Sequence, residues 1–139
     1  MLDQMEQIIT DLVAGWNAHD LDKVTSLYAD DFEEEDIANK DVQRGKAAVR
    51  RTMWLYLRAF PDLKLETDEV VIQGECAAFS WIISGTHRGT LMNIPPTGRA
   101  VRIRGVSMIT VANGRLQRAR RIWDLAGLLR SFGLLPELQ

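Results

Sequence analysis

The spacing of apolar residues changes at Pro61, and this change limits the possible folds more than any other feature of the chain. Before Pro61, apolar residues recur every three or four positions, as in amphipathic helices; after it, apolar and polar residues alternate, as in half-buried strands. The expected helices cover residues 2–16, 21–28 and 47–60, and the expected strands cover residues 63–72, 77–86, 100–111 and 116–124. A short apolar helix is expected to follow, ending near Gly133.

Helices that precede a run of strands are typical of an α+β domain. Asn113-Gly114 is a tight-hairpin signal, so the strands on either side of it should pair antiparallel. We expect one domain over residues 1–139, in which the N-terminal helices pack on a curved, mostly antiparallel sheet. This arrangement is a cone-shaped α+β barrel around a deep pocket. The acidic segment 30–45 looks irregular, with a short strand near Phe32 at most.

Composition excludes several classes of site. A single cysteine, Cys76, rules out an intrachain disulfide or a zinc site of several cysteines, and two histidines make a histidine-rich metal site improbable. The composition therefore gives no indication of a metal site of either kind. The formal net charge of −2 argues against a nucleic-acid partner. No apolar run approaches the ~20 residues that span a bilayer, and the acidic N-terminus is unlike a signal peptide, so a cytoplasmic protein is expected.

Four motifs, in this order, resemble those of a known family. They are AFPDL (residues 59–63), GTHRGTLMNIPPTGR (residues 85–99), NGRL (residues 113–116) and WDLAGLLRSFGLLP (residues 123–136). Together they resemble the SnoaL-like polyketide cyclases, within the nuclear-transport-factor-two-like and ketosteroid-isomerase-like superfamily. The resemblance covers nearly the whole chain. It implies a cone with an apolar pocket, no metal or organic cofactor, and a homodimer or higher homo-oligomer built across the open sheet face.

The resemblance also implies a reaction. Cyclases of this group close a ring by intramolecular aldol condensation, with an aspartate near the end of the last strand as general acid/base. Asp124 matches that aspartate, and His87 and Arg120 match a histidine and an arginine that such cyclases carry. Asp124 has an alternative role as the N-cap of the last helix. His87 is either a satisfied histidine at the pocket rim or a donor to a substrate carbonyl.

Strand periodicity assigns neighbours to faces. If Asp124 points into the cone, Arg120 follows it, where it would bind a substrate oxyanion or pair with Asp124. Arg118 and Arg121 are then expected at a solvated or dimer-facing edge. The aromatic residues expected to line the pocket are Trp16, Trp54 and Trp81, which suit a flat polycyclic ligand.

Two positions depart from the family pattern. In many family members a histidine near the position of Glu35 faces the pocket, and this chain has a carboxylate there instead. In some cyclases a histidine occupies the position of Thr110. Most of the acidic run 33–36 is expected to be solvated loop, but a second carboxylate in the cavity would itself supply a base. Whether Asp124 or Glu35 is the base stays open at this point.

The leading functional hypothesis is an enzyme that performs acid/base chemistry on a bulky apolar carbonyl compound, with polyketide cyclisation as the first choice. Alternatives in the same pocket are polyketide hydroxylation with a partner, steroid isomerisation and epoxide opening. A non-catalytic binding or dimerisation module is the alternative from another class, because fold alone does not decide function.

Overall fold

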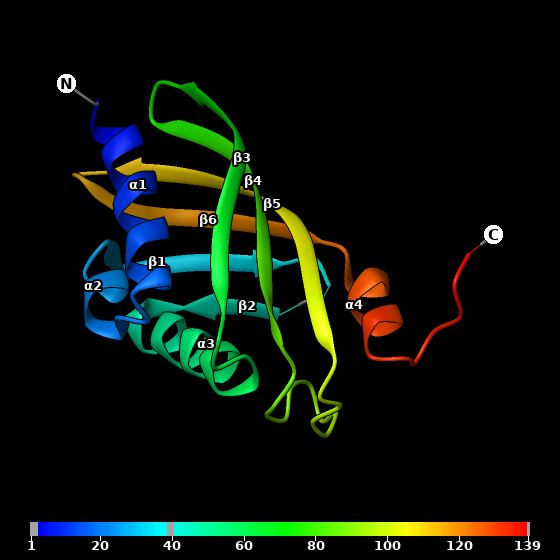
Figure 1. The fold of residues 1–139 in the computed structure, drawn as a ribbon. Coiled ribbons are helices and arrows are strands. Elements are labelled where there is room, and N and C mark those ends of the chain that lie inside the picture. Colours follow the sequence, from blue (N-terminus) through cyan, green and yellow to red (C-terminus); the bar gives the residue numbers. More distant parts are fainter. Residues whose placement is uncertain (1–2, 39–40, 139) are drawn as a thin grey trace.

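The computed structural model describes residues 3–38 and 41–138. Three helices, α1 (Gln4–Asn17), α2 (Leu21–Thr25) and α3 (Gly45–Ala59), pack against a six-stranded sheet. The strands are β1 (Tyr28–Asp36), β2 (Asp41–Arg44), β3 (Lys64–Gln73), β4 (Cys76–Thr86), β5 (Ala100–Ala112) and β6 (Arg115–Trp123), and a last helix, α4 (Leu125–Ser131), follows. Figure 1 shows β3 and β4 running across the direction of β1 and β6, so the sheet bends strongly around the helices. The expected α+β cone is confirmed.

The sheet is mixed and open. Its strand order is β2-β1-β6-β5-β4-β3, with every pair antiparallel except β1 and β6, which run parallel. The expected barrel therefore does not close: β2 and β3 lie at the two edges. Among the described residues, no helix has the length and apolar character needed to cross a membrane.

The acidic segment forms strands, which corrects the expectation of an irregular loop. Residues 28–36 are all in β1, and the second helix ends at Thr25 rather than at residue 28 because β1 begins there. Charge pairing replaces the missing apolar alternation: Glu33 lies opposite Arg44 in β2, and Glu35 lies opposite Arg120 in β6. Opposite charges that face one another across strands stabilise a sheet.

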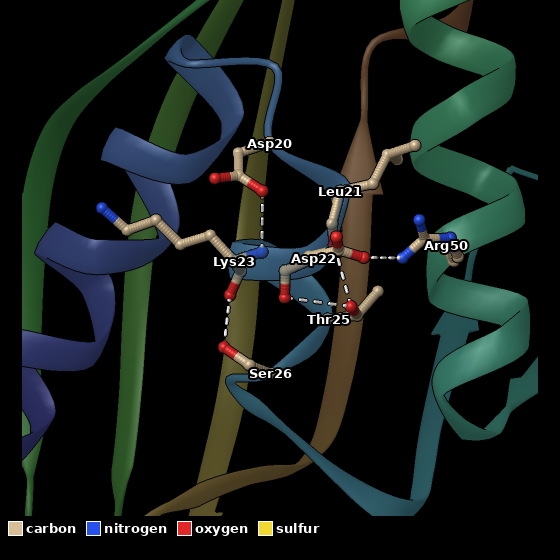
Figure 2. A network of polar contacts seen from close by, with 7 residues as sticks. All are labelled: Asp20, Leu21, Asp22, Lys23, Thr25, Ser26 and Arg50. Carbon is tan, nitrogen blue, oxygen red and sulfur yellow. Dashed lines mark hydrogen bonds and ion pairs between the residues drawn. The ribbon is translucent and has the colours of Figure 1, made fainter.

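The helices begin at capping residues and are joined by side chains. Asp3 and Asp20 accept hydrogen bonds from the backbone N–H groups of Glu6 (2.8 Å) and Lys23 (3.0 Å) at the starts of α1 and α2. Figure 2 shows that Asp22 of α2 then reaches Arg50 of α3, 2.6 Å away. These contacts hold the helices over one face of the sheet, which we call the inner face.

The core fills most of the space between the helices and the inner face. Its largest fully buried side chains come from β1, α3, the chain after α3, β5, β6 and α4; they include Phe32, Met53, Phe60, Ile103, Leu116 and Leu128. Gly105 of β5 makes room for an indole, since a Cβ there would overlap the ring of Trp81 on β4. The ring of Trp81 therefore lies against Gly105, and Trp81 lines a cavity.

Candidate active site

A cavity lies between the helices and the inner face. Its volume is about 90 Å³, and most of its wall is apolar. The helices contribute Leu12, Trp16, Val49, Thr52 and Tyr56; the strands contribute Tyr28, Glu34, Gln43, Leu65, Phe79, Trp81, Ile83, Ile103, Ser107 and Arg121. An apolar pocket with a few converging polar groups is the usual form of a small-molecule site.

A buried ionic cluster forms the polar end of this cavity. Glu34 and Asp36 of β1 share the inner face with Arg121 of β6, because alternate residues of a strand point to the same side. Nη2 of Arg121 donates to Oδ2 of Asp36 at 2.6 Å, and Nε1 of Trp123 donates to Oδ1 of Asp36 at 2.9 Å. Asp36 and Trp123 thus hold the guanidinium in one orientation.

Glu34 is the second carboxylate of the cluster and is held less tightly. Its Oε1 lies 3.6 Å from Nε of Arg121, and both side chains are more than four-fifths buried. Within the described residues, Nε of Arg121 has no hydrogen-bond partner. A carboxylate and a guanidinium group therefore both line the cavity.

Burial dominates the electrostatics here. It raises the pKa of Glu34 above the ordinary value of 4.5; Arg121 opposes this shift and the nearby charge of Asp36 adds to it. Burial also raises the pKa values of Tyr28 and Tyr56, so both phenols stay protonated at neutral pH. The site combines a desolvated carboxylate, a permanent cation and two neutral phenols.

A larger pocket, which we call the vestibule, adjoins the cavity. It has a volume of about 430 Å³ and shares Gln43, Thr52, Tyr56 and Arg121 with the cavity. Its other lining residues are Asp36, Arg51, Leu55, Arg58, Thr90, Leu91, Met92 and Asn93. The two spaces therefore share a wall that includes Arg121 of the ionic cluster.

Comparison with known proteins places this arrangement in a family. Residues 6–132 match the family model of the SnoaL-like polyketide cyclases. The chain belongs to this family. The match includes every residue of the cavity and of the vestibule.

Solved structures show the same fold. AclR from Streptomyces galilaeus, a candidate hydroxylase, is 25% identical, with a TM-score of 0.85 over 96% of this chain and 87% of its own. TsrD from Streptomyces laurentii is 24% identical, with a TM-score of 0.86 over 97% of this chain and 100% of its own. IdmH from Streptomyces antibioticus, a candidate polyketide cyclase, is 24% identical, with a TM-score of 0.82 over 94% and 99%.

Asp124 of this SnoaL-like protein lies outside the cavity. The side chain is exposed and accepts a hydrogen bond from the backbone N–H of Gly127 at 2.8 Å, which caps α4. Strand β6 ends at Trp123, so Asp124 falls in the turn into the helix rather than on the inner face. The structure thus favours the helix-cap alternative for Asp124.

His87 is fully buried, and it too lies away from the cavity. Its ring stacks on Phe132 with 4.1 Å between centroids, and Nδ1 accepts a hydrogen bond from the backbone N–H of Thr97 at 3.2 Å. The imidazole therefore joins the Pro-Pro connection to the end of α4. The expected pairing of His87 with Asp124 in one cavity is not found.

Arg120, Glu35 and Thr110 lie on the opposite, outer face of the sheet. Nε of Arg120 donates to Oε2 of Glu35 at 3.1 Å, and all three residues line a pocket of about 470 Å³ on that face. The sequence analysis placed Arg120 inside only on the condition that Asp124 points into the cone, and Asp124 does not line the cavity. Counted within β6, Arg121 faces inward and Arg120 outward.

Two of the three predicted tryptophans line the cavity. Trp16 of α1 and Trp81 of β4 form part of its wall, and Nε1 of Trp81 donates to Oγ of Ser107 at 2.9 Å. Trp54 is 50% exposed and lies outside, with the guanidinium of Arg58 5.0 Å from its ring centroid. Its position on α3 turns it away from the sheet.

The residues missed from the sequence are the charged and phenolic ones: Glu34, Arg121, Tyr28 and Tyr56. A usable signal did exist. Glu34 and Asp36 alternate with Glu33 and Glu35, and Arg121 alternates with Arg120. If the acidic run is treated as a strand with two faces, either group of residues is a candidate for the inner face.

Proposed function

We propose that this protein is a cofactor-free enzyme in which Glu34 acts as general acid/base on a bulky carbonyl compound, with ring closure of a polyketide-type substrate as the reaction. One observation carries the proposal: a desolvated carboxylate lies 3.6 Å from a fixed guanidinium in an otherwise apolar cavity. Family membership supports the substrate class, and likeness to IdmH, a candidate polyketide cyclase, supports the reaction.

The proposed steps are two proton transfers and one bond formation. Ionised Glu34 removes a proton from the carbon next to a carbonyl, which leaves an enolate whose charge the Arg121 guanidinium stabilises. The enolate carbon attacks a second carbonyl of the same molecule and forms the carbon–carbon bond. The carboxylic acid of Glu34 then returns its proton to the new alkoxide, which restores the carboxylate and yields the aldol.

The apolar wall has two roles in this scheme. It excludes water, so a carboxylate with a raised pKa meets a carbon acid without competition from solvent. Trp81, held by Ser107, and Trp16 offer flat surfaces for a planar substrate. The phenols of Tyr28 and Tyr56 supply further hydrogen-bond donors to carbonyl oxygens.

Proton exchange tests the acid/base step without the natural substrate. We expect the protein to catalyse exchange of the α-hydrogens of 2-tetralone in deuterated buffer, followed by NMR. The rate should rise with pH along a single acidic limb and level off, because only ionised Glu34 accepts a proton. The apparent pKa of that limb should lie above 4.5, since burial raises the pKa of Glu34. Exchange no faster than in buffer at every pH would refute the proposal.

We also propose a homodimer formed through the outer face. Exposed apolar side chains gather there on neighbouring strands, with opposite charges beside them; the apolar ones are Val71, Val106, Met108 and Ile122. A second copy would cover the apolar patch and let the arginines of one subunit approach the glutamates of the other. This arrangement would leave the cavity on the far side of the sheet free.

Sedimentation tests the dimer. Met108→Glu would place a charge in the middle of the apolar patch, so we expect a shift from dimer to monomer at micromolar concentration in analytical ultracentrifugation. Thr10→Glu, at an exposed position of α1, is the control and should remain dimeric. A wild-type protein that sediments as a monomer at millimolar concentration would disprove the interface.

A further inference from the structure

Among the residues that line the vestibule, arginines outnumber carboxylates. Three arginines line it, Arg51, Arg58 and Arg121, against one carboxylate, that of Asp36, which is bonded to Arg121. Among the described residues, no carboxylate lies within ion-pair distance of Arg51 or Arg58. Within the part of the chain that the structure describes, two cations therefore face a concave space without an ion-pair partner of their own.

The position of Arg58 is set by its neighbours. Its Nη2 donates to the carbonyl oxygen of Thr90 at 3.2 Å, and the guanidinium lies over the ring of Trp54. These contacts use one face and one nitrogen and leave the other N–H groups available. Arg58 is thus pre-oriented, which lowers the entropic cost of binding an anion.

A tight turn bounds the other side of the vestibule. Leu91 and Ile94 pair across a two-residue turn, and its central residues, Met92 and Asn93, both have positive φ (49° and 63°). Gly89 brings this segment against the end of α3, since a Cβ there would overlap the carbonyl of Arg58. The turn therefore adds an apolar side chain, Met92, to the wall of the vestibule.

We propose that the vestibule binds an anionic end of the substrate, a carboxylate or a phosphate, through Arg51 and Arg58, while the apolar body of the same molecule enters the cavity. The inference rests on the proposed function in taking the cavity as the substrate site. Arginine matches oxyanions with paired N–H groups, and the shared wall at Tyr56 and Thr52 links the two spaces. The substrate is accordingly an amphiphilic acid rather than a neutral polycycle.

Binding of matched probes tests this assignment. The probes are 2-naphthylacetate, 2-naphthyl phosphate and the neutral 2-naphthylacetamide, followed through the fluorescence of Trp16 and Trp81. We expect at least one acid to bind roughly tenfold more tightly than the amide at low salt, and the difference to shrink as salt rises to about 1 M. The stronger acid identifies the anion as carboxylate or phosphate. Equal binding of acids and amide, or no binding, would overturn the proposal.

Neighbouring arginines on α3 provide the variants. Arg51→Gln and Arg58→Gln should each remove most of the preference for the acid, and Arg58→Lys should keep part of it. Arg50→Gln is the matched control, because Arg50 points to Asp22 of α2 (Figure 2), and it should leave the preference unchanged. A preference that survives both Arg51→Gln and Arg58→Gln would place the anion elsewhere and overturn the assignment.

The same measurements separate this inference from the proposed reaction. If wild-type protein and Glu34→Gln both prefer the acid but neither exchanges the protons of 2-tetralone, the vestibule assignment stands and the acid/base proposal fails. If exchange depends on Glu34 while acid and amide bind equally, the reaction stands and the vestibule assignment fails.

Discussion

Replacing Glu34 with Gln should reduce proton exchange from 2-tetralone by about 100- to 10,000-fold, the usual contribution of a general base. The amide keeps the size of the side chain but cannot accept the proton at neutral pH. Affinity for 2-naphthylacetamide should change little, because the apolar wall is untouched. The acidic limb of the pH profile should disappear with the carboxylate that causes it.

Glu35→Gln is the matched control for this variant. Glu35 is the next residue in β1, but its side chain lies on the outer face with Arg120, so exchange should stay within about twofold of wild type. Asp124→Asn should also retain exchange, since Asp124 caps α4 outside the cavity. Full activity in Glu34→Gln together with loss in Asp124→Asn would return the base to Asp124 and contradict the site described above.

Replacing Arg121 with Met should lower the free energy of unfolding by about 3–5 kcal/mol, the range for removing one partner of a buried ion pair. The change leaves Asp36, whose side chain is 3% exposed, without the guanidinium that bonds it. It also leaves Glu34 without the one cation that holds its pKa down. Chemical denaturation at pH 7 measures the loss.

The loss should depend on pH in a defined direction. The pKa of Glu34 is raised in the folded protein above 4.5, so folding binds protons there and stability falls as pH rises from 4.5 through the folded pKa. Without Arg121 the folded pKa rises further, so the variant should lose stability over a wider pH window than wild type. Arg120→Met, on the outer face, is the control and should cost less than about 1 kcal/mol. Equal losses in the two variants would argue against a buried cluster.

Much of the fold follows from local patterns. The strands after Pro61 were predicted because apolar residues alternate along them, and the β5–β6 turn because Asn113-Gly114 adopts the positive φ values that such a turn needs (53° and 75°). The acidic strand β1 was predicted only as a short strand near Phe32, because its stability depends on partners about 85 positions later in the chain. Periodicity within a segment carries no information on such pairings.

The candidate site was harder to predict than the fold, since it depends on a choice between two faces. If the inner face is assigned one residue off, Arg120 and Glu35 take the places of Arg121 and Glu34. Both pairs consist of an arginine and a glutamate, so the sequence alone does not distinguish them. Asp124 cannot define the inner face, because β6 ends at Trp123 and Asp124 lies outside the strand. The sequence predicted the four strands after Pro61, but it indicated neither the full length of β1 nor which of its faces lines the cavity.

The parallel pairing of β1 with β6 has a mechanical consequence. Alternate residues of these two strands form the ionic cluster on the inner face and the Glu35–Arg120 pair on the outer face. Both surfaces therefore depend on the backbones of β1 and β6. A molecule that docks on the outer face would contact the same two strands that carry Glu34 and Arg121. Cavity and exterior are thus separated there by a single layer of sheet.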